Sequence, residues 1–152
     1  MKFLQIAQTP SPNTKALARA SFNAMQSYCE AEADFISACP TQITADDLAH
    51  IDGLVLGTIE NIGALAGLTK DMFDRCYDDW LTFPEALPVA LYIRAGLDGT
   101  ATSRSLEAIA SALKWRLIAP PLILQGRYDD EMLDKVSELS GALTAGVESG
   151  IF

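Results

Sequence analysis

Five apolar runs alternate with stretches of helical spacing along the chain, and this alternation limits the fold more than any other feature. The runs cover residues 3–8, 33–38, 53–57, 88–93 and 116–124. Between and after them, apolar residues recur at intervals of three and four, which is typical of helices packed on one face. The order predicts one α/β domain over residues 1–152, a doubly wound parallel sheet with helices on both faces.

The expected elements differ in how clearly the sequence marks them. The run at 53–57, GLVLG, is apolar throughout, as in a strand covered on both faces. Pro120 and Pro121 interrupt the fifth run, so we expect it at an edge of the sheet. Helices are expected over residues 14–29, after a Thr44 cap, around 65–80, around 106–113 and around 132–143.

Charge and composition exclude several classes of function. The formal net charge of -9 disfavours binding to a phosphate backbone, so nucleic acid is not an expected partner. No apolar run approaches the roughly 20 residues of a membrane span, so no membrane segment is expected. The dispersed cysteines, Cys29, Cys39 and Cys76, fit free thiols in the reducing cytoplasm, and the single His50 anchors no metal site.

In a doubly wound sheet, ligands bind outside the carboxyl ends of the strands. Three loops of this chain are expected at that edge, residues 9–14, 58–63 and 94–99. The function of the protein is therefore expected to lie in these three stretches.

The first of these loops, TPSPNT, is rich in hydrogen-bonding side chains at the start of an expected helix. A helix N-terminus offers unpaired amides and the positive end of a dipole, and it attracts anions. The pattern Thr9-x-Ser11-x-Asn13-Thr14 resembles the T/S-x-T/S-G-N-T phosphate loop of flavodoxins. That resemblance implies that the four residues hold the phosphate of flavin mononucleotide (FMN). Pro12 departs from it, because flavodoxins usually carry glycine there and proline lacks an N–H donor.

The second loop extends the resemblance. The stretch from Asp52 to Arg75 resembles the flavodoxin-like NAD(P)H-dependent FMN reductases. The matching positions are Gly57, Thr58, Gly63, Gly67, Lys70, Phe73, Asp74 and Arg75. Ile59 departs from the pattern, which usually has proline at this place.

The resemblance implies a flavodoxin-like fold with strand order 2-1-3-4-5, FMN as cofactor and NADPH or NADH as reductant. It implies that the second and third loops hold the flavin ring, chiefly through main-chain groups. The expected ring contacts are Thr58, Ile59, Glu60, Asn61, Gly63, Arg94, Ala95, Gly96, Asp98 and Gly99.

Two side chains near the expected ring have alternative roles. Glu60 either accepts a hydrogen bond from a ring N–H, lowers the flavin potential by its charge, or is exposed to solvent. Arg94 either counters a negative flavin or phosphate, or is a solvated residue at the end of a strand. No aromatic residue lies in either ring loop, so weaker flavin binding or a pocket completed by a second chain of a homodimer is expected.

Several functions fit this fold. The leading hypothesis is an FMN-dependent oxidoreductase that uses NAD(P)H to reduce a small-molecule acceptor. The alternatives are a flavodoxin-type carrier that docks on redox partner proteins, and a flavin-free member of the fold. A phosphoacceptor receiver domain is excluded, because it needs acidic residues where this chain has Gln8-Thr9 and Gly57-Thr58.

Overall fold

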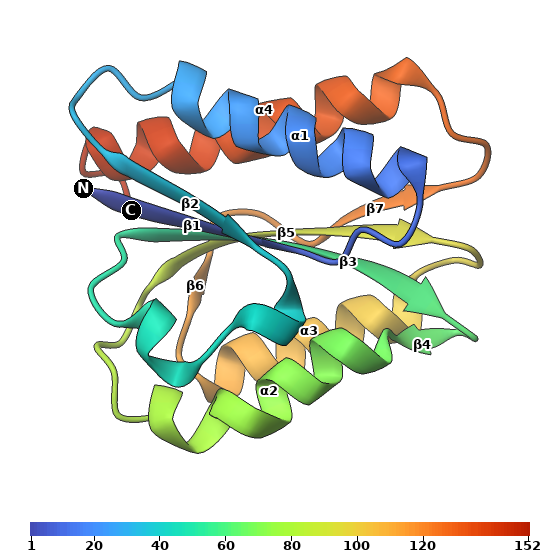
Figure 1. Ribbon diagram of the computed structural model, residues 1–152, viewed down its shortest axis with the longest axis horizontal. Coiled ribbons are helices and arrows are strands. Elements are labelled where there is room, and N and C mark those ends of the chain that lie inside the picture. Colours follow the sequence, from blue (N-terminus) through green and yellow to red (C-terminus); the bar gives the residue numbers. More distant parts are fainter.

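The computed structural model describes residues 1–152 and shows one sheet between two layers of helices (Figure 1). Helices α1 and α4 cover one face, and α2 and α3 cover the other (Figure 1). The strands are β1 (Lys2–Ala7), β2 (Asp34–Ala38), β3 (Gly53–Asn61), β4 (Ala64–Leu65), β5 (Pro88–Ala95), β6 (Arg116–Leu117) and β7 (Leu122–Gln125). The helices are α1 (Pro12–Ser27), α2 (Gly67–Trp80), α3 (Thr100–Ala112) and α4 (Asp130–Glu148), with 3-10 turns η1 (Pro40–Gln42) and η2 (Ala45–Leu48).

The sheet order β2-β1-β3-β5-β6 confirms the predicted order 2-1-3-4-5. The strands on this path pair in parallel, and β7 also pairs in parallel with β5. The predicted fifth strand is split into β6 and β7 by its prolines, and it lies at the edge as expected.

Two apolar cores lie on the two faces of the sheet. The core under α2 and α3 includes Leu4, Leu56, Met72, Trp80 and Leu106. The core under α1 and α4 includes Phe3, Leu17, Val55, Val136 and Leu143. Strands β1, β3 and β5 contribute to both cores, which explains why their sequences are apolar at consecutive positions.

The short helix predicted after the Thr44 cap is present between β2 and β3, as a 3-10 helix and not as an α-helix. Only the 3-10 turns η1 and η2 lie there, and Thr44 caps η2 with its amide and hydroxyl bonded to Asp47. Arg75 donates to the carbonyls of Pro40 and Ile43, and the Trp80 indole donates to Ala45 O. Side chains of α2 thus satisfy carbonyls that a longer helix would have satisfied internally.

Residues 58–61 were predicted as loop but continue strand β3. This extension turns back as a hairpin, in which Glu60 pairs with Leu65 and Asn61 with Ala64. Ile62 and Gly63 form the two-residue turn with φ of 52° and 71°, as primed hairpin turns require. Arg94 and Ala95, also expected in a loop, are the last residues of β5.

No helix of the structure is both long enough and apolar enough to span a membrane.

Candidate functional site

Strands β1, β3 and β5 all end at the right-hand edge of the sheet in Figure 1, which we call the carboxyl edge. The turn after β1, the β3–β4 hairpin and the loop after β5 lie at this edge, together with the start of α1 (Figure 1). The structure therefore brings together the three stretches singled out in the sequence.

The turn of residues 9–14 is closed by its own hydroxyls. Ser11 caps α1: its Oγ accepts from the Thr14 amide at 3.2 Å, and Thr14 Oγ1 accepts from the Ser11 amide at 3.0 Å. Thr14 Oγ1 also donates to Ser11 O at 2.9 Å, and the Thr14 side chain is buried. The side chain of Thr14 therefore serves the helix start and not the surface, in contrast to the prediction that it faces a phosphate.

Few hydrogen-bond donors of the turn remain free for an anion, but they are adjacent. Pro10 and Pro12 have no N–H, and the amides of Ser11 and Thr14 are already paired. The amides of Thr9 and Asn13 have no acceptor in the protein, and neither do their side chains. Two amides, one hydroxyl and one carboxamide are thus available at the positive end of α1.

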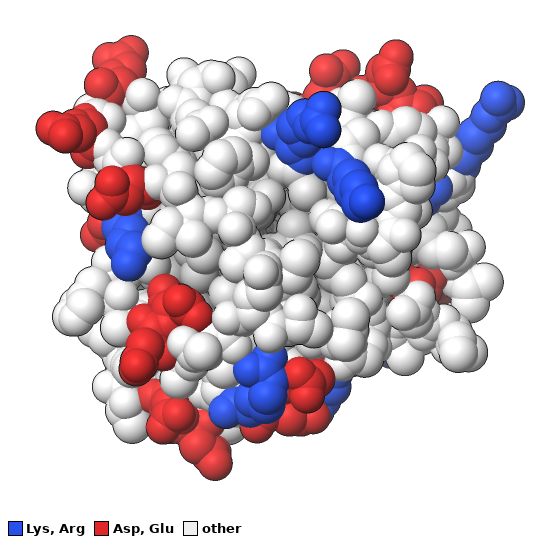
Figure 2. Space-filling view, viewed as in Figure 1, with Lys and Arg blue, Asp and Glu red and all other residues white.

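Basic side chains lie beside this turn. Lys15 and Arg19 are exposed on the first turns of α1 and line a shallow depression there with Pro12. Figure 2 shows Lys and Arg atoms over α1, whereas Asp and Glu atoms lie at the left, at the bottom and at the upper right of the view. Two cations therefore lie close to the start of α1, and they favour an anion there.

Glu60 is buried, which contradicts the alternative that it is exposed to solvent. The residue is only 9% exposed. Its carboxylate accepts hydrogen bonds from the amides of Leu97 at 2.5 Å and Gly99 at 3.2 Å. The carboxylate thereby joins the β3–β4 hairpin to the loop after β5. These two amides are no longer free to bind a flavin ring as predicted.

Two exposed apolar side chains at this edge were missed by the sequence analysis. Ile62, at the hairpin turn, is 104% exposed, and Leu97 in the loop after β5 is 63% exposed. A β-branched residue at positive φ is rare and strained, and such strain is typical of functional sites. The signal in the sequence was an isoleucine between Asn61 and Gly63, where a hairpin turn favours asparagine or glycine.

Other predicted ring contacts have structural roles. The Thr58 hydroxyl bonds to Thr69 Oγ1 at 2.7 Å, and Thr69 donates to Gln8 Oε1, so these bonds link β3, α2 and the residue that follows β1. The Asp98 carboxylate accepts from the Thr100 amide at 2.9 Å, and this bond lowers the pKa of Asp98. Ile59, Asn61, Gly63, Ala95 and Gly96 lie at the edge without side-chain hydrogen bonds.

Arg94 holds the end of β7 and is not a free cation. Its guanidinium donates to the carbonyls of Ala95 at 3.0 Å, Leu124 at 2.8 Å and Gly126 at 2.6 Å. Arg94 is a partly exposed residue at the end of a strand, as one of the two alternatives held, but these carbonyls fix its guanidinium.

Replacing Arg94 with alanine should lower the free energy of unfolding by about 1–2 kcal/mol, because three carbonyls lose a charged donor. Lysine should not restore the loss, since one ammonium cannot reproduce the guanidinium fork. Urea unfolding measures this, with the exposed neighbour Arg127→Ala as the control. Equal midpoints for the two alanine variants would contradict the assigned role.

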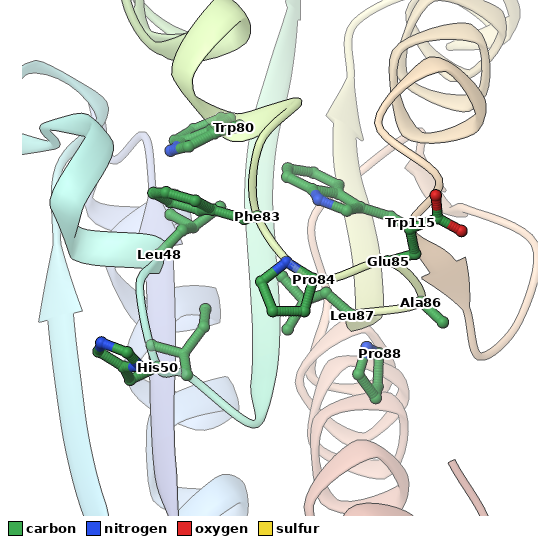
Figure 3. Close-up of a pocket in the computed structure, with 11 residues that line it drawn as sticks. Leu48, His50, Trp80, Phe83, Pro84, Glu85, Ala86, Leu87, Pro88 and Trp115 are labelled. Carbon is green, nitrogen blue, oxygen red and sulfur yellow. The ribbon is translucent and has the colours of Figure 1, made fainter.

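A hollow of about 230 Å³ lies at the opposite edge of the sheet. It is lined by aromatic and proline side chains, including Trp80, Phe83, Pro84 and Trp115, with His50 at its rim (Figure 3). It lies near Pro88, where β5 begins, and so is at the amino ends of the strands. It is not part of the site at the carboxyl edge.

Solved structures similar to this chain share its whole architecture. No protein-family model matches the sequence, and no curated protein matches it significantly. A flavodoxin from the domain Archaea superposes with a TM-score of 0.80 at 18% identity, covering 97% of this chain and 99% of that one. Flavodoxin 2 from Bacillus cereus gives a TM-score of 0.71 at 20% identity and 100% coverage of both chains.

The flavodiiron core of Flv1 from Synechocystis gives a TM-score of 0.80 at 11% identity. The match covers 99% of this chain but only 36% of the Flv1 chain, so it concerns one part of a longer protein. With parallel strands in the order found here and these structural neighbours, the chain has a flavodoxin-like fold.

Proposed function

We propose that this protein binds FMN at the carboxyl edge and transfers electrons through it. The observation that carries the proposal is that a helix start with unpaired amides lies at the same edge of the sheet as two exposed apolar side chains, Ile62 and Leu97. A phosphate ester attached to a flat, largely apolar ring matches both features. The flavodoxin-like fold, and the neighbours named as flavodoxins, support the same ligand.

The residues present fit FMN, with a reduced set of hydrogen-bond donors to its phosphate. The Thr9 and Asn13 amides and side chains would hold the phosphate, and the ring would lie against Ile62 and Leu97. Glu60 keeps the hairpin and the following loop in place, and a free lone pair of its carboxylate is an acceptor for a ring N–H. FMN supplies the redox chemistry when bound, and the protein supplies its position and surroundings.

Two sources of electrons fit the proposed site, a nicotinamide cofactor and a redox partner protein. The helix stretch that resembles the reductases is used by the fold: Lys70 pairs with Asp74, and Arg75 pairs with Asp71 and holds η1. These side chains therefore give no support to nicotinamide binding. The net charge of -9 favours a carrier that docks on basic partners.

The test of FMN binding compares FMN with riboflavin, which lacks the phosphate, by fluorescence titration of the purified protein. FMN should bind more tightly than riboflavin. The double variant Thr9→Ala with Asn13→Ala should weaken FMN by about tenfold or more, at about 1.4 kcal/mol or more of lost hydrogen bonding to a charged group. Asn23→Ala, an exposed change on the same helix, is the control.

Absence of flavin binding would overturn the proposal and leave a flavin-free member of the fold. If FMN binds, anaerobic mixing with NADPH or NADH separates the two sources of electrons. Bleaching of the flavin by either nicotinamide indicates a reductase. A flavin bleached by dithionite but by neither nicotinamide indicates a carrier.

A further inference from the structure

Tyr92 in β5 carries a phenol hydroxyl that forms no hydrogen bond within the protein. The residue is only 3% exposed, and its ring lies across Gly57 of the neighbouring strand β3. A Cβ atom on Gly57 would lie 2.1 Å from Tyr92 Cζ and 2.2 Å from its hydroxyl oxygen. The ring therefore fills the space that a side chain at position 57 would occupy.

The position of this hydroxyl follows from the sheet register. Gly57 pairs with Tyr92 on one side and with Ala7 on the other, so the three residues form one row across the sheet. Ala7 is the last residue of β1, and the chain leaves it directly into the turn of residues 9–14. Tyr92 packs in the core under α1 and α4, so its hydroxyl lies on the face of the sheet that α1 covers. It belongs to the same row as Ala7, after which the turn begins.

The Tyr92 side chain is almost wholly enclosed by the core, but its hydroxyl oxygen is not among the fully buried polar atoms, and it forms no hydrogen bond with any group of the protein. The hydroxyl is therefore accessible and free to bond to a ligand, whereas a phenylalanine would fill the same apolar space without a donor. Burial raises the pKa of the Tyr92 phenol well above its ordinary value, so the group keeps its proton and remains a donor.

We propose that the Tyr92 hydroxyl donates a hydrogen bond to the phosphate ester of the flavin, from the sheet side of the turn of residues 9–14. It supplies a hydrogen bond where Pro10 and Pro12 have removed two amide donors. This inference rests on the proposed function and deepens it. It assigns recognition of the phosphate to the body of the sheet as well as to the start of α1.

The test is Tyr92→Phe, which keeps the ring over Gly57 and removes only the oxygen. The affinity for FMN should fall about tenfold or more, whereas the affinity for riboflavin should stay within about twofold of wild type. Tyr77→Phe, a half-buried tyrosine of α2, is the matched control and should leave both affinities unchanged. A melting curve of each variant without ligand verifies that it is folded.

A second measurement detects the phosphate without the ring. Inorganic phosphate should raise the melting temperature of the wild-type protein more than that of Tyr92→Phe. Equal FMN affinities of wild type and Tyr92→Phe would overturn the inference while leaving the proposed function intact. A parallel loss of FMN and riboflavin would also overturn it, because the residue would then support the ring site. A wild-type protein that binds neither flavin would instead refute the proposed function itself.

Discussion

Replacing Gly57 with alanine should lower the free energy of unfolding by about 3 kcal/mol, one of the largest effects expected from a single methyl group in this chain. The new Cβ would lie 2.1 Å from Tyr92 Cζ and 2.6 Å from Cε1, far inside van der Waals contact. Neither residue has room to move, because Gly57 is hydrogen-bonded in the centre of the sheet and the Tyr92 ring is buried. Urea unfolding followed by circular dichroism measures the loss.

The control for this prediction is Gly67→Ala at the first residue of α2. A Cβ atom there meets nothing within 4 Å, so stability should be unchanged or slightly increased. Combining Gly57→Ala with Tyr92→Val removes the ring that causes the clash. The double variant should then be less destabilised than the sum of the two single variants. Strict additivity would show that the cost at position 57 does not come from Tyr92.

The central strands could be predicted from the residues because they are buried on both faces, whereas the strand order 2-1-3-4-5 was expected only from the resemblance to flavodoxins. Residues 54–56 of β3 are Leu, Val and Leu, and all three are fully buried. Such a run needs no knowledge of its neighbours to be recognised. The prolines at 120 and 121 likewise place the last strand at the edge, because they cannot donate to a sheet ladder.

Two features of the fold that differ from the prediction, the 3-10 helices before β3 and the extension of β3, depend on distant contacts. The η1 and η2 turns are held by Arg75 and Trp80, which lie more than thirty residues further along the chain. The continuation of β3 beyond residue 57 depends on pairing with β4 and on Ile62 adopting a left-handed conformation. Local preference opposes that conformation in isoleucine, so the hairpin is not evident from propensity.

The location of the candidate site was predictable, but the partners of its side chains were not. Topology alone brings the carboxyl ends of β1, β3 and β5 to one edge. Whether Glu60 and Arg94 face a ligand or the protein is decided by amides and carbonyls that lie 30 or more residues away in sequence. Sequence spacing contains no information about such pairs.

Replacing Glu60 with alanine should lower the free energy of unfolding by about 2–3 kcal/mol and release the loop after β5. The substitution leaves the amides of Leu97 and Gly99 without an acceptor, and the Gly99 amide is buried. Hydrogen bonds to a charged group contribute more than neutral ones, and an unpaired buried donor adds a desolvation cost. Hydrogen exchange at these two amides should accelerate more than at the centre of β5.

The function of this carboxylate is tested by the pattern of flavin affinities. If Glu60 positions the two segments against which the ring lies, Glu60→Ala should weaken FMN and riboflavin by the same factor. Tyr92→Phe should weaken FMN alone, so the two variants separate the ring from the phosphate. Glu107→Ala, the same substitution at an exposed position of α3, is the control and should leave hydrogen exchange and both affinities as in the wild type. Slow exchange at Leu97 and Gly99 in Glu60→Ala would show that the loop is held by other contacts, and that Glu60 does not organise the carboxyl edge.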